Sequence, residues 1–486
     1  RYYPYGEILS HILGFVGSDK VGLSGLEYTY NNYLTGKNGE LKYYSDGMGN
    51  KLEMPDSYVK PRKGNTLKLT LDIDLVLALN NELANAMSKY DSEQALGIVM
   101  NPQTGEILAM NSKPSFDPDN YQGFSEEVIN RNLPVWMTYE PGSTFKIITL
   151  AASMNEKTVD LFKDTFVDTG AINVDGATLH CWKKGGHREE TMLQVVENSC
   201  NPGFVAMGLK LGTSTLMKYI KDFGFGENTG IDLNGEATGI LFNTNKMGNV
   251  ELATTAFGQG VSVTPIQQIR AVSAAINGGT LYSPYIVKNY LESETNTVVK
   301  SVTPNAVYQV IKKDTSDLVK YALESVVAKG SGHNAYIENY RIGGKTGTAQ
   351  VVENGRYSSS QYILSFIGFM PADNPQIVVY VAIKNAKNVV QYGGTVSAPV
   401  ARNIFLSAID ILNIKSDTTG IPKEYTWLDT KYVTVPDVNG ASLDQAKKLL
   451  KGFSVEYSGI GDKVVYQSPI AGSFAKEGGT VVLMLN

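Results

Sequence analysis

The alternation of apolar and polar residues along the chain predicts both strands and helices. The segment "TLKLTLDIDLVLALNNELANAM", residues 66–87, passes from strand-like alternation to apolar residues at helical spacing. "EQALGIVMNPQTGEILAMNS", residues 93–112, is typical of two strands joined by an Asn-Pro-Gln-Thr-Gly turn. "APVARNIFLSAIDIL", residues 398–412, predicts a closing helix. We therefore expect a mixed α and β domain over residues 72–412.

The two ends of the chain show different patterns. Residues 1–71 mix short aromatic-rich strands with glycine turns and predict a small scaffold domain. Residues 413–431 are polar and broken by glycine and proline, which is typical of a linker. In residues 432–486, Ser442 and Gln445 form a capping-box pattern before a short helix and alternating strands. We expect a final module with one helix on a small sheet.

Length and charge narrow the class of protein. A chain of 486 residues exceeds the roughly 250 to 300 residues at which single cores stop growing, so we expect about three domains. With 43 basic and 48 acidic residues the formal net charge is -5, and no basic block occurs, which argues against a nucleic-acid partner. The sequence contains no uninterrupted run of about 18 apolar residues, so it predicts no membrane span within these residues. The chain opens at Arg1, and we expect an upstream stretch, with any signal or anchor, to have been left out.

A serine and a lysine lie one helical turn apart in "EPGSTFKIITLAASMNE", residues 140–156. Ser143 at a helix start has backbone N–H groups that favour an oxyanion, and the Lys146 amine lies within reach of its proton. A lysine base must be neutral for part of its cycle, so we expect burial and a second cation, Lys345, to lower its pKa. The same Ser-x-x-Lys spacing at residues 57–60 and 473–476 makes this motif weak evidence alone.

Two further motifs strengthen the prediction. In "SCN", residues 199–201, the hydroxyl of Ser199 and the amide of Asn201 can face one side of a turn. Cys200 between them would then point into the body of the domain.

The third motif, "GGKTGTAQVV" at residues 343–352, reads as a glycine-led strand. Alternate side chains share a face of a strand, so Thr346 and Thr348 can hold a carboxylate, with Lys345 adding positive charge. Gly347 would let a substrate backbone lie close. The three motifs in this order are typical of β-lactamases and penicillin-binding proteins.

With these motifs the chain resembles the class B penicillin-binding proteins, monofunctional D,D-transpeptidases of the bacterial cell wall. "RYYPYGEILSHILGFVG" is similar to the end of the family's N-terminal pedestal, residues 72–412 to its transpeptidase domain and 432–486 to a PASTA domain. The resemblance implies an α/β multidomain protein in which an antiparallel sheet carries helices on both faces, beside an all-helical part. "HCWKKGGH" and "NSCNPG" are most similar to a sporulation type, with a vegetative enzyme of division or elongation as the alternative.

The resemblance also implies roles for the motif residues. Ser143 would attack the penultimate D-alanine carbonyl of a stem pentapeptide, with Lys146 as its base. Ser199 would relay the proton to the departing D-alanine, and Asn201 would bind substrate amides. Lys345, Thr346 and Thr348 would bind the terminal carboxylate, and the backbone N–H groups of Ser143 and Thr348 would form the oxyanion hole.

The partners and location implied by the resemblance are those of a cell-wall enzyme. Peptidoglycan stem peptides and β-lactams would occupy the site, catalysis would need no cofactor, and a membrane glycosyltransferase would be a partner. The protein would be extracytoplasmic and anchored to the cell membrane by an N-terminal helix absent from this sequence.

Two other functions share the three motifs. A serine β-lactamase needs a placed base such as a glutamate to hydrolyse its acyl-enzyme. The nearest sequence to its E-x-x-L-N pattern is "GIDLN", which has Gly230 where the carboxylate would be needed. A β-lactam sensor would acylate without turnover and would not need a pedestal or a PASTA domain.

Both cysteines and half of the four histidines fall between residues 180 and 200. Cys181 and Cys200 could be unrelated buried thiols, or they could form a disulfide outside the cytoplasm. The preferred interpretation is a structural zinc site, because two thiolates, an imidazole and a carboxylate are typical tetrahedral ligands. His187 would supply the imidazole, and Asp168 is favoured over His180 as fourth ligand.

Overall fold

The computed structural model describes residues 1–353, 355–424 and 432–486, without the side chains of residues 53–56 and 432. The chain divides into two compact units, one of residues 1–335 and 342–415 and one of residues 336–341 and 416–486. Within the described parts of the chain, no helix is both long and apolar enough to cross a membrane.

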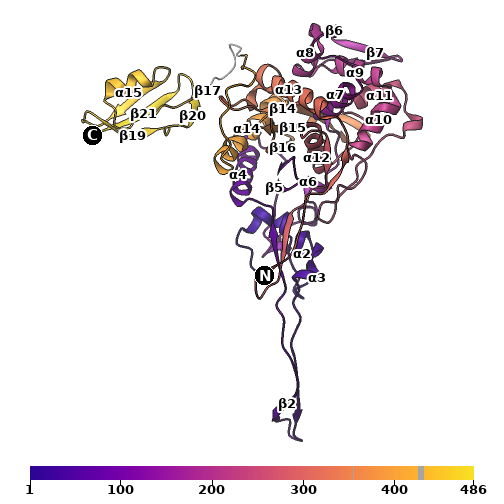
Figure 1. The fold of residues 1–486 in the computed structure, drawn as a ribbon, viewed down its shortest axis with the longest axis vertical. Coiled ribbons are helices and arrows are strands. Elements are labelled where there is room, and N and C mark those ends of the chain that lie inside the picture. The colour runs from indigo at the N-terminus through magenta and orange to yellow at the C-terminus, as the bar shows by residue number, and fades with distance from the viewer. Residues whose placement is uncertain (354, 425–431) are drawn as a thin grey trace. The chain divides into compact units, whose positions relative to one another are not determined.

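A five-stranded antiparallel sheet forms the centre of the first unit (Figure 1). In spatial order its strands are β14 (Gly343–Glu353), β15 (Arg356–Met370), β16 (Ile377–Lys384), β4 (Gln94–Met100) and β5 (Ile107–Lys113). The two strands predicted around the Asn-Pro-Gln-Thr-Gly turn are therefore confirmed as the neighbours β4 and β5. The third sequence motif lies on β14, at one edge of the sheet.

Helices cover both faces of this sheet (Figure 1). On one face lie α4 (Ile73–Tyr90) and α14 (Gly393–Ile411), which also contact each other. On the other lie α6 (Leu133–Trp136), α12 (Pro265–Ile276) and α13 (Lys313–Lys329). Because both faces are covered, β16 is buried from Ile377 to Ile383 and reads as a continuous apolar run. The predicted sheet with helices on both faces is confirmed.

The all-helical part packs beside the sheet. It contains α7 (Lys146–Asn155), α8 (Met192–Glu197), α9 (Asn201–Leu211), α10 (Thr213–Asp222) and α11 (Asn249–Ala256). Two small two-stranded sheets contact α9, one of β6 (Thr165–Asp168) with β9 (Arg188–Thr191) and one of β7 (Ala171–Val174) with β8 (Ala177–His180). The first two motifs and the cysteine-rich segment therefore meet in this region.

The N-terminal segment differs in part from the prediction of short strands. Residues 6–13 are helical, as the 3-10 helix η1 (Gly6–Leu9) and α1 (Ser10–Leu13), because Leu9 and Ile12 point into the core at helical spacing. The further elements are α2 (Gly25–Thr29), α3 (Asn31–Leu34), β1 (Glu40–Ser45), β2 (Lys51–Val59) and β3 (Thr66–Leu69). β1, which is exposed along its length, pairs with β2, whereas β3 pairs with β11 (Val287–Leu291).

The first unit also contains α5 (Glu126–Asn130), β10 (Thr280–Tyr282), β12 (Val298–Ser301) and β13 (Ala306–Gln309). Its further 3-10 helices include η2 (Tyr121–Gly123), η4 (Thr244–Lys246) and η5 (His333–Ala335). β12 pairs with β11, and β10 pairs with β13.

The second unit contains α15 (Leu443–Leu449) and two small sheets. One sheet has the strand order β18 (Ser454–Ser458), β21 (Thr480–Leu485), β19 (Val464–Ser468), and the other pairs β17 (Tyr432–Thr434) with β20 (Phe474–Lys476). The predicted capping box is confirmed, since Gln445 N donates to Ser442 Oγ and Ser442 N to Gln445 Oε1. Of the predicted linker, residues 413–424 carry no helix or strand and residues 425–431 lie outside the described residues.

Candidate active site

The three sequence motifs meet at one pocket of about 620 Å³ in the first unit. Its lining from the motifs consists of Gly142, Ser143, Ser199, Asn201, Thr346, Thr348 and Gln350. The remaining lining residues are Trp182, Phe257, Gln259, Ser331, His333, Asn334, Tyr362, Tyr392, Gly393, Gly394 and Thr395. The motifs are far apart in the sequence, and the fold brings them to one place.

Ser143 lies at a helix start, as its sequence predicts. It belongs to the 3-10 helix η3 (Gly142–Phe145), which runs directly into α7. Gly142 has a left-handed φ of 54°, and a Cβ there would lie 2.9 Å from the Thr348 carbonyl oxygen. Glycine is therefore required for the serine turn to lie against strand β14.

Lys146 is completely buried and contacts the pocket residues Ser199 and Asn201. Its Nζ donates to Ser199 Oγ at 3.1 Å, to the Ser199 carbonyl at 2.9 Å and to Asn201 Oδ1 at 2.6 Å. Among the hydrogen bonds of the described residues, none joins Lys146 Nζ to Ser143 Oγ. Catalytic hydrogen bonds are often long before substrate binds, so the lack of this bond is compatible with Lys146 as the base that deprotonates Ser143. Burial lowers the pKa of the Lys146 amine to about 7, against an opposing effect of Cys200 and Cys181.

Lys345 is the second buried amine of the site. Its Nζ donates to Ser199 Oγ at 2.8 Å and to the Thr346 carbonyl at 3.1 Å. Burial, and then the charge of Lys146, lowers the pKa of Lys345 well below its usual value. Burial is the main cause that lowers the pKa of both amines. Two buried amines bridged by one hydroxyl repel each other when both are charged, so the site favours charge on only one of them.

The two threonines of the third motif face the pocket, but Gly347 does not line it. A Cβ at Gly347 would lie 2.4 Å from Ser365 Oγ and 2.9 Å from Thr144 Cγ2. Packing inside the domain therefore requires glycine here. That Gly347 also lets a substrate backbone lie close stays a prediction. Thr348 Oγ1 accepts from Gly393 N at 3.2 Å, which joins this strand to the start of α14.

Ser199 adopts a left-handed backbone conformation with a φ of 54°. Such a conformation costs a non-glycine residue of the order of 1–3 kcal/mol, so the surroundings must hold it. In this conformation Ser199 and Asn201 both line the pocket. Cys200, between them, is fully buried and begins α9 as its N-cap residue. The expectation that its side chain points into the domain is confirmed.

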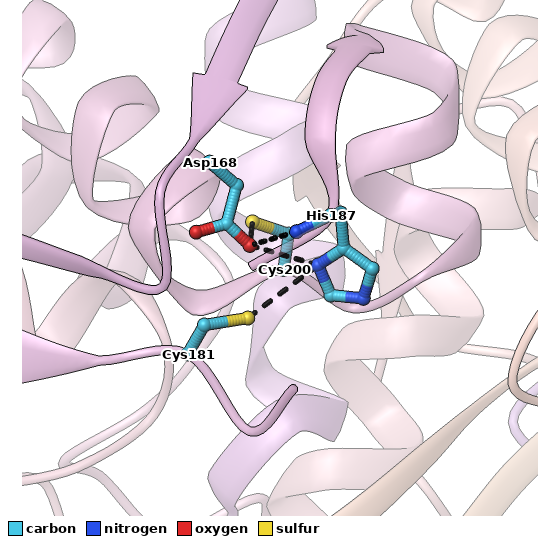
Figure 2. Close-up of side chains that lie close together, drawn as sticks. All are labelled: Asp168, Cys181, His187 and Cys200. Atoms are coloured by element: carbon cyan, nitrogen blue, oxygen red, sulfur yellow. Dashed lines mark hydrogen bonds and ion pairs between the residues drawn. The ribbon is translucent and has the colours of Figure 1, made fainter. Parts of the chain in front are cut away.

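Behind this turn the structure brings Asp168, Cys181, His187 and Cys200 together (Figure 2). Their ligand atoms all lie within 4.8 Å of one another. His187 Nδ1 is 2.8 Å from Asp168 Oδ2 and 3.4 Å from Cys181 Sγ, and Cys200 Sγ donates to Asp168 Oδ2 at 3.4 Å. These four residues are called the thiol cluster below.

The hydrogen bonds of the thiol cluster favour negative charge on Asp168 and Cys181. Burial by itself would raise the pKa of Asp168, but hydrogen bonds from a neighbouring thiol and from the backbone of Gly170 and His187 hold it below its usual value. The contact between the two cysteines lowers the pKa of Cys181 and raises that of Cys200. Both cysteines are free thiols, and His180 is exposed outside the cluster.

Several pocket residues were not found by the sequence motifs. Trp182 directly follows Cys181, and Tyr392 precedes the glycine pair that opens α14. Ser331 Oγ accepts from Thr346 Oγ1 at 3.3 Å. The only signal for Trp182 was its place in the cysteine and histidine segment. Tyr392 and Ser331 had none, because their contacts depend on chain segments distant in sequence.

The fold and the pocket define a class of enzyme. An antiparallel sheet flanked by helices carries a serine at a helix start, and two buried amines share the hydroxyl of a second serine. This is a serine acyl-transfer enzyme with the fold of the penicillin-recognising proteins.

Comparison with known families identifies the group within this class. Residues 95–406 match the penicillin binding protein transpeptidase domain, residues 1–69 the penicillin-binding protein dimerisation domain and residues 433–486 the PASTA domain. The chain belongs to the class B penicillin-binding protein transpeptidases, and the family predicted from its motifs is confirmed.

Individual relatives agree with this assignment. Stage V sporulation protein D of Bacillus subtilis (strain 168) is 54% identical over 486 residues, which are 100% of this chain and 75% of that protein. Peptidoglycan D,D-transpeptidase FtsI of Escherichia coli (strain K12) is 31% identical, over 87% of this chain and 70% of that protein. The crystal structure of penicillin binding protein 3 from Mycobacterium tuberculosis complexed with aztreonam aligns with a TM-score of 0.77 and 26% identity, over 87% of this chain and 93% of that one.

Proposed function

We propose that this D,D-transpeptidase cross-links peptidoglycan stem peptides through an acyl-enzyme on Ser143. The observation that carries the proposal is the pair of buried amines, Lys146 and Lys345, that share Ser199 Oγ at the base of the pocket. Lys146, with a pKa of about 7, takes the proton of Ser143 as it attacks the penultimate D-alanine carbonyl. Ser199 passes a proton to the departing D-alanine, and an amine from a neighbouring strand then takes the acyl group.

The other motif residues bind the substrate in this proposal. Thr346 and Thr348 hold the terminal carboxylate beside Lys345, and Asn201 binds substrate amides. The backbone N–H groups of Ser143 and Thr348 stabilise the oxyanion, which is worth roughly 3 to 4 kcal/mol per donor in acyl transfer. The contact between Gly142 and Thr348, which sets these two segments side by side, supports this assignment.

Cross-linking and slow hydrolysis distinguish the transpeptidase from a β-lactamase or a sensor. We expect the penicillin adduct to persist for minutes or longer, because none of the described residues that line the pocket is a carboxylate. We also expect cross-linked dimers when the protein is incubated with isolated peptidoglycan precursors. Intact-protein mass spectrometry follows the adduct and chromatography follows the dimers. Turnover of penicillin at several molecules per second would indicate a β-lactamase, and a stable adduct without dimers a sensor.

We further propose that the thiol cluster binds a structural zinc ion. Zinc bonds of about 2.0 to 2.3 Å place neighbouring tetrahedral ligand atoms roughly 3.3 to 3.8 Å apart. The two contacts of 3.4 Å within the cluster are in this range, whereas His187 Nδ1 and Asp168 Oδ2 are closer, at 2.8 Å. The whole set lies within 4.8 Å. Two sulfurs, an imidazole and a carboxylate are also the ligands that zinc prefers. Four protein ligands leave no position for water, so the ion would hold the Ser199 turn without taking part in the reaction.

Elemental analysis tests the zinc proposal. We expect about one zinc per chain in protein purified without chelator, and removal of the metal should lower both the melting temperature and the acylation rate. His187→Ala should lose the metal, whereas His180→Ala, which changes an exposed histidine outside the cluster, should keep it. No metal together with no free thiols would instead establish the disulfide between Cys181 and Cys200.

The biological setting is proposed from the relatives. The 54% identity to stage V sporulation protein D supports a role in making the spore cortex, with a vegetative role as the alternative. We place the protein outside the cytoplasm, held by an N-terminal anchor and working beside a membrane glycosyltransferase. We also propose residues 1–71 as the pedestal, 72–412 as the transpeptidase domain, 413–431 as the linker and 432–486 as the PASTA domain.

A further inference from the structure

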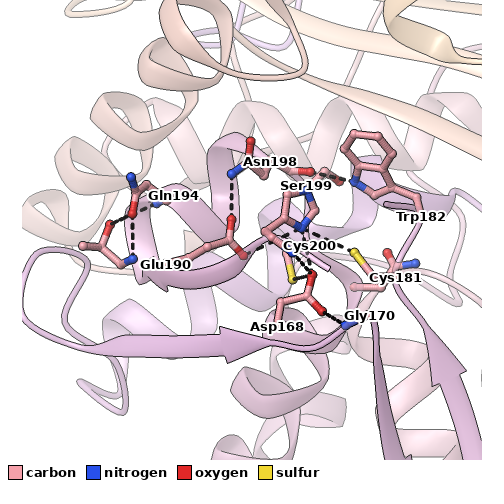
Figure 3. A network of polar contacts seen from close by, with 12 residues as sticks. Asp168, Gly170, Cys181, Trp182, Glu190, Gln194, Asn198, Ser199 and Cys200 are labelled. Carbon is pink, nitrogen blue, oxygen red and sulfur yellow. Dashed lines mark hydrogen bonds and ion pairs between the residues drawn. The ribbon is translucent and has the colours of Figure 1, made fainter. Parts of the chain in front are cut away.

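Asn198, the residue before Ser199, is held through its backbone N–H, its side-chain amide and its carbonyl oxygen (Figure 3). Asn198 N donates to the Gln194 carbonyl at 2.8 Å, its side-chain Nδ2 donates to Glu190 Oε1 at 2.6 Å, and its carbonyl accepts from Trp182 Nε1 at 2.8 Å. Asn198 is thus held by α8, by strand β9 and by the loop after Cys181. The left-handed conformation of Ser199 begins directly after this fixed point.

Glu190 is a buried carboxylate that no step described under the proposed function uses, and it is not one of the four residues of the thiol cluster. It is 3% exposed, and its Oε2 has no hydrogen-bond partner among the described residues. This oxygen lies 3.8 Å from His187 Nδ1. Burying a charged group is unfavourable unless its hydrogen bonds compensate, and the short bond to Asn198 is the one that the Glu190 side chain makes among the residues that the structure describes.

Trp182 holds the other side of Asn198. Its ring lines the pocket and meets the His187 ring edge to face at 5.3 Å and the Tyr392 ring at 6.2 Å. Trp182 directly follows Cys181 in the sequence, and Glu190 lies three residues after His187. Both contacts to Asn198 therefore come from the same segment that supplies the thiol cluster.

We propose that Glu190 and Trp182 are positioning residues of the acyl transfer, which hold Asn198 and thereby keep Ser199 in its left-handed conformation. Ser199 Oγ lies 3.1 Å from Lys146 Nζ and 2.8 Å from Lys345 Nζ in this conformation. If Asn198 is released, Ser199 relaxes to an ordinary φ and its hydroxyl leaves the two amines. This inference rests on the function proposed above, in which Ser199 carries the proton.

Substitutions of Glu190 test the side-chain contact. Glu190→Ala should lower the rate constant of acylation by penicillin about 10- to 100-fold, since a displacement of about 1 Å is enough for such a loss. Penicillin binding before acylation should change less than twofold. Glu190→Gln keeps the acceptor oxygen and should restore most of the rate. The control is Glu189→Ala, which removes an exposed carboxylate on the same strand and should leave the rate unchanged.

A double-mutant cycle with Asn198→Ala tests whether Glu190 acts through Asn198. If it does, the double variant should be no slower than the slower single variant. Multiplied losses would overturn the proposal, because Glu190 would then act elsewhere. Loss of bound zinc from Glu190→Ala would also overturn it, by making Glu190 a metal ligand.

The contact from Trp182 is tested by Trp182→Phe, which keeps an aromatic ring but removes the N–H donor. We expect a loss of about tenfold in the acylation rate constant, with unchanged zinc content, and no loss in Trp136→Phe. A lower melting temperature with a wild-type acylation rate would show a structural role only and would refute the proposal.

Labelling of Ser143 should still reach completion in every variant. If the wild-type protein itself fails to label, the proposed function fails, not this inference.

Discussion

Ser143→Ala protein is expected to form no covalent adduct with penicillin, whereas the wild-type protein gains the mass of one penicillin per chain. The hydroxyl of Ser143 is the attacking group at the pocket, and alanine offers no atom that could bond to the carbonyl carbon. Stability should change by no more than about 1 kcal/mol, because the side chain is partly exposed at the pocket. Intact-protein mass spectrometry and a thermal melt measure the two effects.

The chain supplies a matched control for this experiment. Ser473 has the same Ser-x-x-Lys spacing, with Lys476, but lies in the second unit, where its hydroxyl donates to the Ile470 carbonyl. Ser473→Ala should label like the wild-type protein. Retained labelling in Ser143→Ala would mean that another residue is the nucleophile.

Lys146→Arg should acylate about 100- to 10,000-fold more slowly than the wild-type protein, which is the usual contribution of a general base. Arginine keeps the positive charge but does not give up its proton at any ordinary pH. Burial lowers the pKa of Lys146 to about 7, so a lysine here can be neutral under working conditions. Lys476→Arg, the corresponding change at the other Ser-x-x-Lys spacing, should have no effect.

The same base gives the wild-type protein a defined pH dependence. A neutral amine is the active form, so acylation should be slow below the pKa of about 7 and fast above it. About a tenth of the chains are active at pH 6 and about nine tenths at pH 8, which is close to a tenfold rise. Stopped-flow measurement with a fluorescent penicillin gives this profile. A rate independent of pH between 6 and 8, or a wild-type rate in Lys146→Arg, would exclude Lys146 as the base.

The amino-acid sequence carried the local features of the fold. Apolar spacing predicted α4, α14 and the strand pair β4 and β5, and the capping pattern at Ser442 predicted the start of α15. It was less successful in residues 6–13, where short aromatic-rich segments were read as strands. Those segments are too short for periodicity to distinguish a helical turn from a strand, and packing of Leu9 and Ile12 decided the matter.

At the site, residue types and spacing were enough to name the motif residues, because each motif is local and its chemistry belongs to its side chains. Which atoms touch was decided by the tertiary structure. Segments distant in sequence surround Ser199 Oγ with two buried amines, and this burial sets the pKa of Lys146.

The same division holds for Gly347 and for the thiol cluster. The sequence named Gly347 as part of the third motif, but only packing against Ser365 showed why glycine is required there. It also named the four residues of the cluster, whereas the links from Glu190 and Trp182 to Asn198 had no local pattern. Periodicity and motifs report what a chain segment can do alone. Distances between segments, and the pKa values that depend on them, arise only when the fold removes side chains from water and places them against one another.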